Sequence, residues 1–297
     1  MSSRPIDAVI AGAQKGGTTS LAYYLGQHPE ICTHERLEFS YFSNDLDYAE
    51  GYEKSFRRYF AHCDLQARLL AKSVTIMTES RLVKRLKAHS PDVRVIVVLR
   101  NPVDRAYSAF WWARKSGYEP LTRFEDALDA NPARHGGDIV RVRSTAYLPF
   151  GEYAGQVEGL FDEFGRQRVL VVLFDDLQRD TPSVVRSAFE FLGVDPSFRP
   201  EMEKRNVAGR ARSGLLARLL TGQSRFKRRI RAALPRGWAE GWKRRAEAWN
   251  TASFRPPPMH PDTRRRLSEH FAPHNERLST LIGADLSGWA EATGERG

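Results

Sequence analysis

Three short apolar runs stand out along this chain of 297 residues. The strongest is Val93–Arg100, which is apolar at almost every position, and Asp7–Gly12 and Arg168–Phe174 are similar but weaker. Short apolar runs bounded by polar residues are typical of parallel strands that are buried on both faces. The pattern therefore predicts three strands of a parallel sheet.

A helical pattern follows each of these runs. After the first, Leu21, Tyr24 and Leu25 have the spacing of one helical face. The second predicted helix has Pro102 in its first turn and stops at Gly117. The third begins with Thr181 as a cap and Pro182 in its first turn, and it stops at Gly193. Repeated strand–helix units predict an α/β fold with a central parallel sheet flanked by helices.

The C-terminal third of the chain has a different composition. Residues 210–245 are rich in arginine and lysine, and "RPPPMHP" separates them from a last predicted helix over Thr263–Ile282. Neither repeats nor a clear linker divide the chain. We expect one domain over residues 1–297, with a basic excursion at about 210–250.

The charge and cysteine content limit the class of protein further. Lysines and arginines exceed acids to give a net charge of +10, which favours an anionic ligand, an anionic polymer or an acidic membrane surface. The two cysteines, Cys32 and Cys63, are too few to indicate a disulfide scaffold, and we expect small buried side chains. Without a signal peptide or an apolar stretch of about 18 residues, the sequence predicts a cytoplasmic protein.

The segment Ala11–Leu21 ("AGAQKGGTTSL") joins the first predicted strand to the first helix. Gly12 and Gly17 have the separation of a P-loop, but Thr18 occupies the place of its lysine and Lys15 lies inside the loop. Such a loop directs backbone N–H groups and the positive end of the helix dipole at one point. The segment therefore predicts a phosphate site, with a purely structural glycine turn as the alternative.

The displaced lysine disfavours a magnesium-dependent triphosphatase. Such a site needs its lysine on the β- and γ-phosphates and an adjacent serine or threonine on Mg²⁺. The strand Val93–Arg100 also ends in arginine rather than in a metal-binding aspartate. We expect no metal at this loop.

Several segments resemble one enzyme family. "GAQKGGTTSL" looks like the 5′-phosphosulfate loop of the sulfotransferases that use 3′-phosphoadenosine 5′-phosphosulfate (PAPS), and "VVLRNPVDRAYSAFWW" looks like their 3′-phosphate motif. The wider pattern is most similar to the heparan sulfate type, the N-sulfotransferases and 3-O-sulfotransferases, and to bacterial relatives. Further matches follow in order along nearly the whole chain: "EFSYF", "AKSVTIM", "YLPFGEYAGQVE", "VLVVLFDDL", "FEFLGV" and "GADLSGW". The resemblance implies a P-loop-like core and a metal-independent sulfuryl transfer that releases 3′-phosphoadenosine 5′-phosphate (PAP).

The resemblance also implies roles for the loop residues. The 5′-phosphate would be held by Gly16, Gly17, Thr18 and Thr19. Lys15 would lie near the bridging oxygen of the donor, where a cation lowers the barrier as negative charge develops on the leaving phosphate.

A second group of residues matches the 3′-phosphate motif. Arg100 and Ser108 would clamp the 3′-phosphate, the first as a guanidinium fork and the second as a hydroxyl donor. Arg105 is either a further ligand or a helix-surface arginine paired with Asp104 or another acid. We expect Trp111 and Trp112, at the end of the motif, to pack within the protein rather than to contact adenine.

The acceptor must lose a proton as it attacks, so a general base is needed. Glu38 matches the catalytic glutamate of the heparan sulfate type, although Leu37 stands where relatives often have a lysine. His34 is the rival base. Lys72 matches a lysine near the reacting centre that orients acceptor or base, with an ordinary surface lysine as the alternative.

The segment "KRNVAGRARSG" (204–214) lies where relatives have a basic loop over the nucleotide. Arg210 and Arg212 are its candidate phosphate ligands, with a solvated charge run as the alternative. The basic residues 210–245 could also contact an anionic acceptor or a membrane surface.

Three functions remain open on the sequence. The first is transfer from PAPS to a hydroxyl, with an amine as the alternative, of a carbohydrate or a glycosylated small molecule. The second is a P-loop phosphotransferase with displaced lysine. The third is a non-enzymatic polyanion-binding protein, although no nucleic-acid-binding module is recognised.

Overall fold

The computed structural model describes residues 3–34, 37–130, 139–202, 209–211, 251–253 and 256–290. The chain divides into two compact units. The larger comprises Met1–Arg105, Leu148–Lys204 and Arg264–Gly297, and the smaller comprises Ala106–Tyr147 and Arg205–Thr263. The expectation of a single domain over the whole chain stays a prediction.

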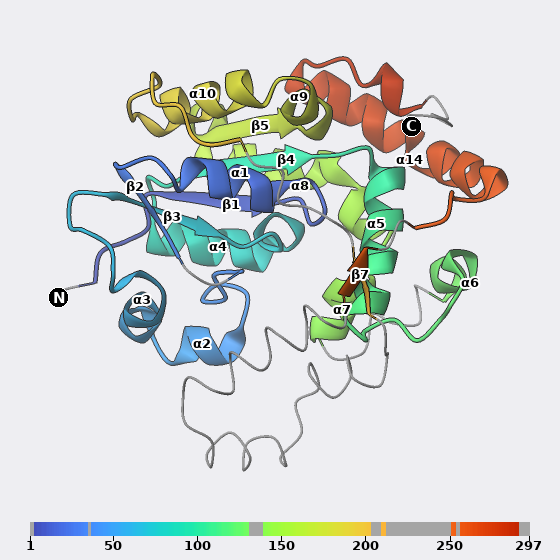
Figure 1. Ribbon diagram of the computed structural model, residues 1–297, viewed down its shortest axis with the longest axis horizontal. Helices are drawn as coiled ribbons and strands as arrows, with labels where there is room; N and C mark the ends of the chain where they lie inside the picture. The colour runs from blue at the N-terminus through green and yellow to red at the C-terminus, as the bar shows by residue number, and fades with distance from the viewer. Residues whose placement is uncertain are drawn as a thin grey trace, which may run out of the picture. The chain divides into compact units, whose positions relative to one another are not determined.

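The larger unit is built on a five-stranded parallel sheet with strand order β2-β3-β1-β4-β5 (Figure 1). The strands are β1 (Ala8–Gly12), β2 (Ile31–Thr33), β3 (Arg68–Lys72), β4 (Arg94–Leu99) and β5 (Val169–Leu173). The three predicted strands are therefore confirmed as β1, β4 and β5. The sequence did not reveal β2 and β3, because β2 has only three residues and a charged residue stands at each end of β3.

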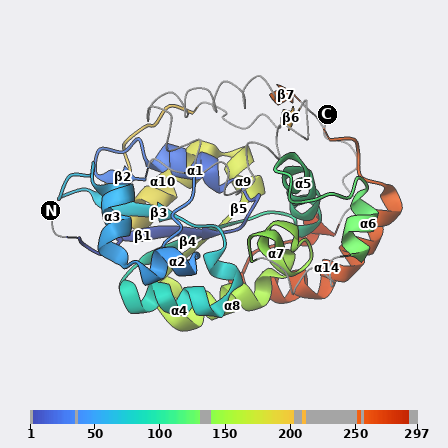
Figure 2. The same ribbon diagram turned by 90° about the horizontal axis from the view of Figure 1, so that it is seen from below.

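Two apolar cores cover the two faces of this sheet. Alternate residues of each central strand enter different cores: Val9 and Val97 face one, and Ile10 and Val98 face the other. The first core also contains residues of α3, α4, α8 and α14, and the second contains residues of α1, α9 and α10. Figure 2 shows α1 and α10 on one side of the sheet and α4 and α8 on the other. This arrangement confirms the predicted α/β architecture.

The helices have these bounds in the structure. Those wholly within the larger unit are α1 (Thr18–Leu25), α2 (Asp45–Ala49), α3 (Tyr52–Phe60), α4 (Ser80–His89), α8 (Tyr153–Phe164), α9 (Phe174–Arg179) and α10 (Thr181–Leu192), with 3-10 turns η1 (Ile76–Thr78), η3 (Pro149–Gly151), η4 (Arg166–Arg168) and η5 (Ser287–Trp289). Two helices, α5 (Pro102–Lys115) and α14 (Pro261–Ile282), have residues in both units. Among the described residues, no helix combines the length and the apolar character needed to span a bilayer.

The predicted helix signals are confirmed with one correction. Pro102 begins α5, and Gly193 ends α10 with φ +68°, a conformation that favours glycine. The cap of α10 is Asp180 rather than Thr181, because its carboxylate accepts the Ser183 N–H at 3.1 Å. An aspartate one position earlier offers the same capping chemistry.

The smaller unit contains α6 (Phe124–Asp129), α7 (Ile139–Thr145) and an antiparallel ribbon of β6 (Gly209–Ala211) and β7 (Thr251–Ser253). Phe110, Phe124 and Tyr147 form its aromatic core, with ring centroids 5.3–6.1 Å apart. Most of the predicted basic excursion, from residue 212 to residue 250, lies outside the described residues.

The expectation of two unpaired cysteines is wrong. Cys32 in β2 and Cys63 after α3 form a disulfide across 31 residues, with their Cα atoms 5.7 Å apart. The sequence could not show this pairing, because it depends on α3 ending beside β2. The disulfide links the edge strand β2 to the segment that follows α3.

Replacing Cys32 and Cys63 together by serine should lower the free energy of unfolding by about 3 kcal/mol, because the cross-link restricts the unfolded chain. Guanidinium denaturation without a thiol reductant measures the change. Dithiothreitol should lower the stability of the wild type by a similar amount and leave the double variant unchanged. Equal midpoints for the two proteins without reductant would contradict the disulfide.

Candidate active site

The loop after β1 has an unusual backbone conformation and is closely packed. Lys15 has φ +68° and Gly17 has φ +92°. A Cβ atom at Gly16 would lie 2.2 Å from the Val98 carbonyl oxygen, and one at Gly17 would lie 2.8 Å from the Phe174 ring. Both glycines are therefore required where they stand. A lysine in the left-handed region is uncommon, and such residues cluster at functional sites.

The loop leads into the N-terminus of α1. Gly17 is its N-cap, and in the described part of the chain neither a capping side chain nor a first-turn acid compensates this end. The first N–H groups of a helix lack intrahelical partners, and the helix dipole adds positive potential there. Thr18 is buried and Thr19 is exposed. These features suit the predicted binding of a phosphate.

The parallel sheet brings three further residues to the same edge. Lys72 ends β3, Arg100 follows β4 and Phe174 follows β5. These strands run parallel to β1, so the four strand ends share the edge at which open α/β sheets bind ligands.

Phe174 connects the glycine loop to Arg100. One part of its ring packs against Gly17, and the Arg100 guanidinium lies 4.8 Å from the ring centroid. A guanidinium over an aromatic face is held in place by the ring quadrupole. Sequence reasoning assigned no role to Phe174. Its only signal was an aromatic side chain directly after a predicted strand.

Two hydrogen bonds hold the backbone at Arg100 and Asn101 in place. The Arg100 carbonyl accepts the Tyr153 hydroxyl at 3.0 Å, while the Asn101 amide donates to the Trp289 carbonyl at 3.2 Å. Burial raises the pKa of Tyr153 to about 12, so the phenol keeps its proton and remains a donor. These bonds fix the position from which Arg100 extends.

Glu38 and Lys72 form an ion pair at the end of β3. The second carboxylate oxygen of Glu38 accepts the Val74 N–H at 3.0 Å. The Lys72 side chain is 8% exposed and that of Glu38 is 43% exposed. The buried lysine therefore orients a carboxylate that solvent or an acceptor can reach.

His34 has a different environment from Glu38. Its Nε2 accepts the backbone N–H of Lys72 at 3.0 Å, and its ring lies 5.8–6.1 Å from the rings of Phe39, Tyr59 and Phe60. A nitrogen that already accepts a hydrogen bond is poorly available to take a proton from an acceptor. The geometry favours Glu38 as the base.

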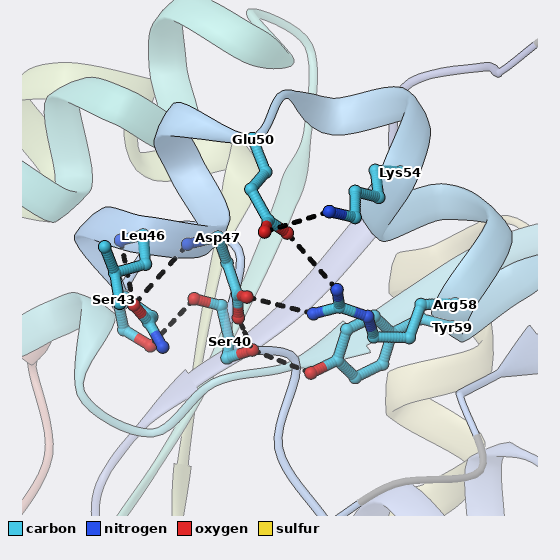
Figure 3. A network of polar contacts seen from close by, with 9 residues as sticks. Ser40, Ser43, Leu46, Asp47, Glu50, Lys54, Arg58 and Tyr59 are labelled. Atoms are coloured by element: carbon cyan, nitrogen blue, oxygen red, sulfur yellow. Dashed lines mark hydrogen bonds and ion pairs between the residues drawn. The ribbon is translucent and has the colours of Figure 1, made fainter.

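A polar network anchors the segment that follows Glu38 (Figure 3). The Ser40 hydroxyl bonds to the Asp47 carboxylate and lies 2.7 Å from the Tyr59 hydroxyl. Asp47 in turn accepts Arg58 at 2.9 Å. The network thus ties the chain two residues beyond Glu38 to α2 and α3.

The structure does not test the predicted roles of Ser108, Arg210 and Arg212. Ser108 is half-buried in the part of α5 that belongs to the smaller unit, so its role beside Arg100 stays a prediction. Arg210 is in β6 and Arg212 lies outside the described residues.

The surface alternative for Arg105 is wrong. Its side chain is fully buried. Asp104 pairs instead with Arg264 at 2.7 Å. Helical periodicity places a charged residue on a face but does not show which face the sheet covers.

The family of the chain follows from comparison with known proteins. A family model described as the sulfotransferase domain matches residues 5–243. The chain belongs to the sulfotransferase family. The prediction of a PAPS-dependent sulfotransferase is thereby confirmed at the level of the family.

Individual sulfotransferases resemble the chain over most of its length. The crystal structure of a sulfotransferase from Alicyclobacillus acidocaldarius is 28% identical, covers 98% of this chain and 100% of that one, and has a TM-score of 0.71. The bifunctional heparan sulfate N-deacetylase/N-sulfotransferases 4 of Mus musculus and 3 of Homo sapiens are each 25% identical over 95% of this chain. The chain spans only 30% of the length of these two relatives.

In this sulfotransferase, Gly17→Ala should weaken PAP binding by at least about tenfold, because the new methyl group meets Phe174 and the positive φ is strained. Isothermal titration calorimetry measures the change. Gly159→Ala, inside α8 with open space around it, is the matched control and should bind PAP like the wild type. Equal affinity of the two variants would contradict the placement of the loop.

Proposed function

We propose that the protein transfers the sulfuryl group of PAPS to a hydroxyl of a carbohydrate or glycosylated small molecule, with an amine as the alternative acceptor. The observation that carries the proposal is the shared sheet edge. On it the Lys15 loop, Arg100 and the Glu38–Lys72 pair follow parallel strands of one unit. An anion site beside an oriented carboxylate is what a sulfuryl transfer requires.

The proposed reaction is an in-line displacement at sulfur. The acceptor oxygen forms a bond to sulfur as the bond from sulfur to the 5′-phosphate oxygen breaks, and PAP leaves. The acceptor proton passes to the Glu38 carboxylate, which has an exposed side chain and a fixed orientation. Lys15 and the first turn of α1 stabilise the negative charge that develops on the phosphate.

Two residues complete the proposed assignment. Lys72 positions Glu38 through their ion pair. Arg100, held by the Phe174 ring and by the hydrogen bond to its own carbonyl, binds the 3′-phosphate. The roles of Ser108, Arg210 and Arg212 as further nucleotide ligands stay predictions from the resemblance.

The acceptor class rests on resemblance and on one feature of the site. The named relatives act on heparan sulfate. Leu37, next to Glu38, is 79% exposed, and it provides an apolar contact where relatives often have a lysine. This difference favours a less anionic acceptor than a sulfated polysaccharide. The disulfide between Cys32 and Cys63 disfavours the predicted cytoplasmic location, because disulfides are rare in that compartment.

The Glu38→Gln variant should lose at least about a hundredfold in turnover and keep its affinity for PAP, because the amide retains the shape but cannot take a proton. Release of PAP from PAPS, measured over a panel of glycosides, tests this. The control is Glu53→Gln, which removes an exposed carboxylate that pairs with Arg57. Retained turnover in Glu38→Gln would assign the base to His34.

The Lys15→Ala variant should lower kcat about 10²- to 10³-fold, which corresponds to roughly 3–4 kcal/mol of lost transition-state stabilisation. The same PAP-release assay measures it. Lys54→Ala on α3, whose lysine pairs with Glu50 at 2.9 Å on the surface, should behave like the wild type. A kcat within about twofold of the wild type in Lys15→Ala would exclude leaving-group stabilisation by this residue.

A further inference from the structure

Two histidines and a glutamate converge on the larger unit, on elements other than those of the loop and the base. His270 and His274 are four residues apart on α14, so they lie on the same helical face. Glu152 precedes α8, and its Oε1 lies 3.2 Å from the Nε2 of His270. One ligand atom from each of the three residues lies within 4.8 Å of the other two.

The chain on both sides of Glu152 is fixed. Gly151 is so close to Phe271 that a Cβ atom there would lie 2.8 Å from the ring. On the other side, Tyr153 is buried and donates to the Arg100 carbonyl. The glutamate is thus held on a rigid turn against α14.

The histidines are also carried by a fixed element. Phe271, next to His270, is fully buried, and Leu267 and Leu278 of α14 are buried as well. Further along the two helices, Glu158 of α8 pairs with Arg277 of α14. Donor atoms on anchored elements lose little conformational entropy when they bind a ligand.

The donor set has the chemistry of a transition-metal site. Two imidazoles and one carboxylate, with a further position open to water, form a known ligand set for Zn²⁺. Imidazole donors select transition metals over Mg²⁺ or Ca²⁺, which prefer oxygen ligands. A Glu152–His270 hydrogen bond alone would explain two of these residues but gives no reason for His274 to lie within the same distance.

We propose that Glu152, His270 and His274 bind one divalent transition-metal ion of the Zn²⁺ class. The ion joins α14 to the turn before α8, whose next residue supports the Arg100 backbone. Its role is to stabilise the fold. It lies on residues that the proposed transfer does not use, so the two proposals fail or succeed independently.

The test uses the full chain, freed of metal with EDTA and with the disulfide intact. Calorimetric titration with Zn²⁺ should show one equivalent of saturable binding. Zinc at about a hundredfold excess over Kd should raise Tm by roughly 5 °C. The His274→Gln and Glu152→Gln variants should each bind Zn²⁺ at least about tenfold more weakly and lose most of the Tm shift.

Two controls separate this site from other histidines. His62→Gln, next to the disulfide, and His260→Gln, at an exposed position, should keep both the stoichiometry and the Tm shift. Circular dichroism and the Tm measured without metal verify that each variant is folded, and Glu152→Gln replaces His274→Gln if the latter misfolds. Absence of saturable binding below about 1 mM Zn²⁺ in the wild type, or wild-type affinity for Zn²⁺ in both ligand variants, would overturn the proposal.

Discussion

The close packing of the Gly16–Gly17 backbone against β4 and Phe174 is the contact on which the proposed site depends. It sets the loop after β1 against the Val98 carbonyl and places the start of α1 next to the ring that also supports Arg100. Only residues without a Cβ atom allow this approach. The two proposed phosphate-binding elements, the loop and Arg100, therefore have a defined separation before any ligand binds, which is the preorganisation that catalysis by electrostatic stabilisation requires.

The second part of the site depends on a buried lysine. Lys72 is nearly inaccessible and pairs with Glu38, whose other oxygen accepts a backbone N–H. Burying an ammonium group without a partner would cost free energy of desolvation, and this cost favours the paired state of Lys72 and Glu38. The network of Ser40, Asp47 and Tyr59 then holds the following residues. The carboxylate is thus oriented by the fold rather than by the acceptor.

The sequence predicted those parts of the fold that have local signals. Apolar runs marked β1, β4 and β5, and the glycine loop marked Lys15 and its neighbours. The edge strand β2 was missed because it has only three residues, and its neighbour β3 was missed because a charged residue stands at each of its ends. The pairing of Cys32 with Cys63, the structural bond of His34 and the contact of Phe174 with Arg100 all join residues far apart in the chain, and such contacts become visible only when the strand order is known.

We propose that the sheet edge binds a nucleotide with both a 5′- and a 3′-phosphate. Calorimetry with PAP and, separately, with ATP plus Mg²⁺, on the wild type and on Arg100→Ala, distinguishes this nucleotide from a triphosphate. We expect the wild type to prefer PAP and Arg100→Ala to lose at least about tenfold in PAP affinity, because a charge-assisted fork to the 3′-phosphate is removed. A preference for ATP, or equal PAP affinity in the two proteins, would contradict it.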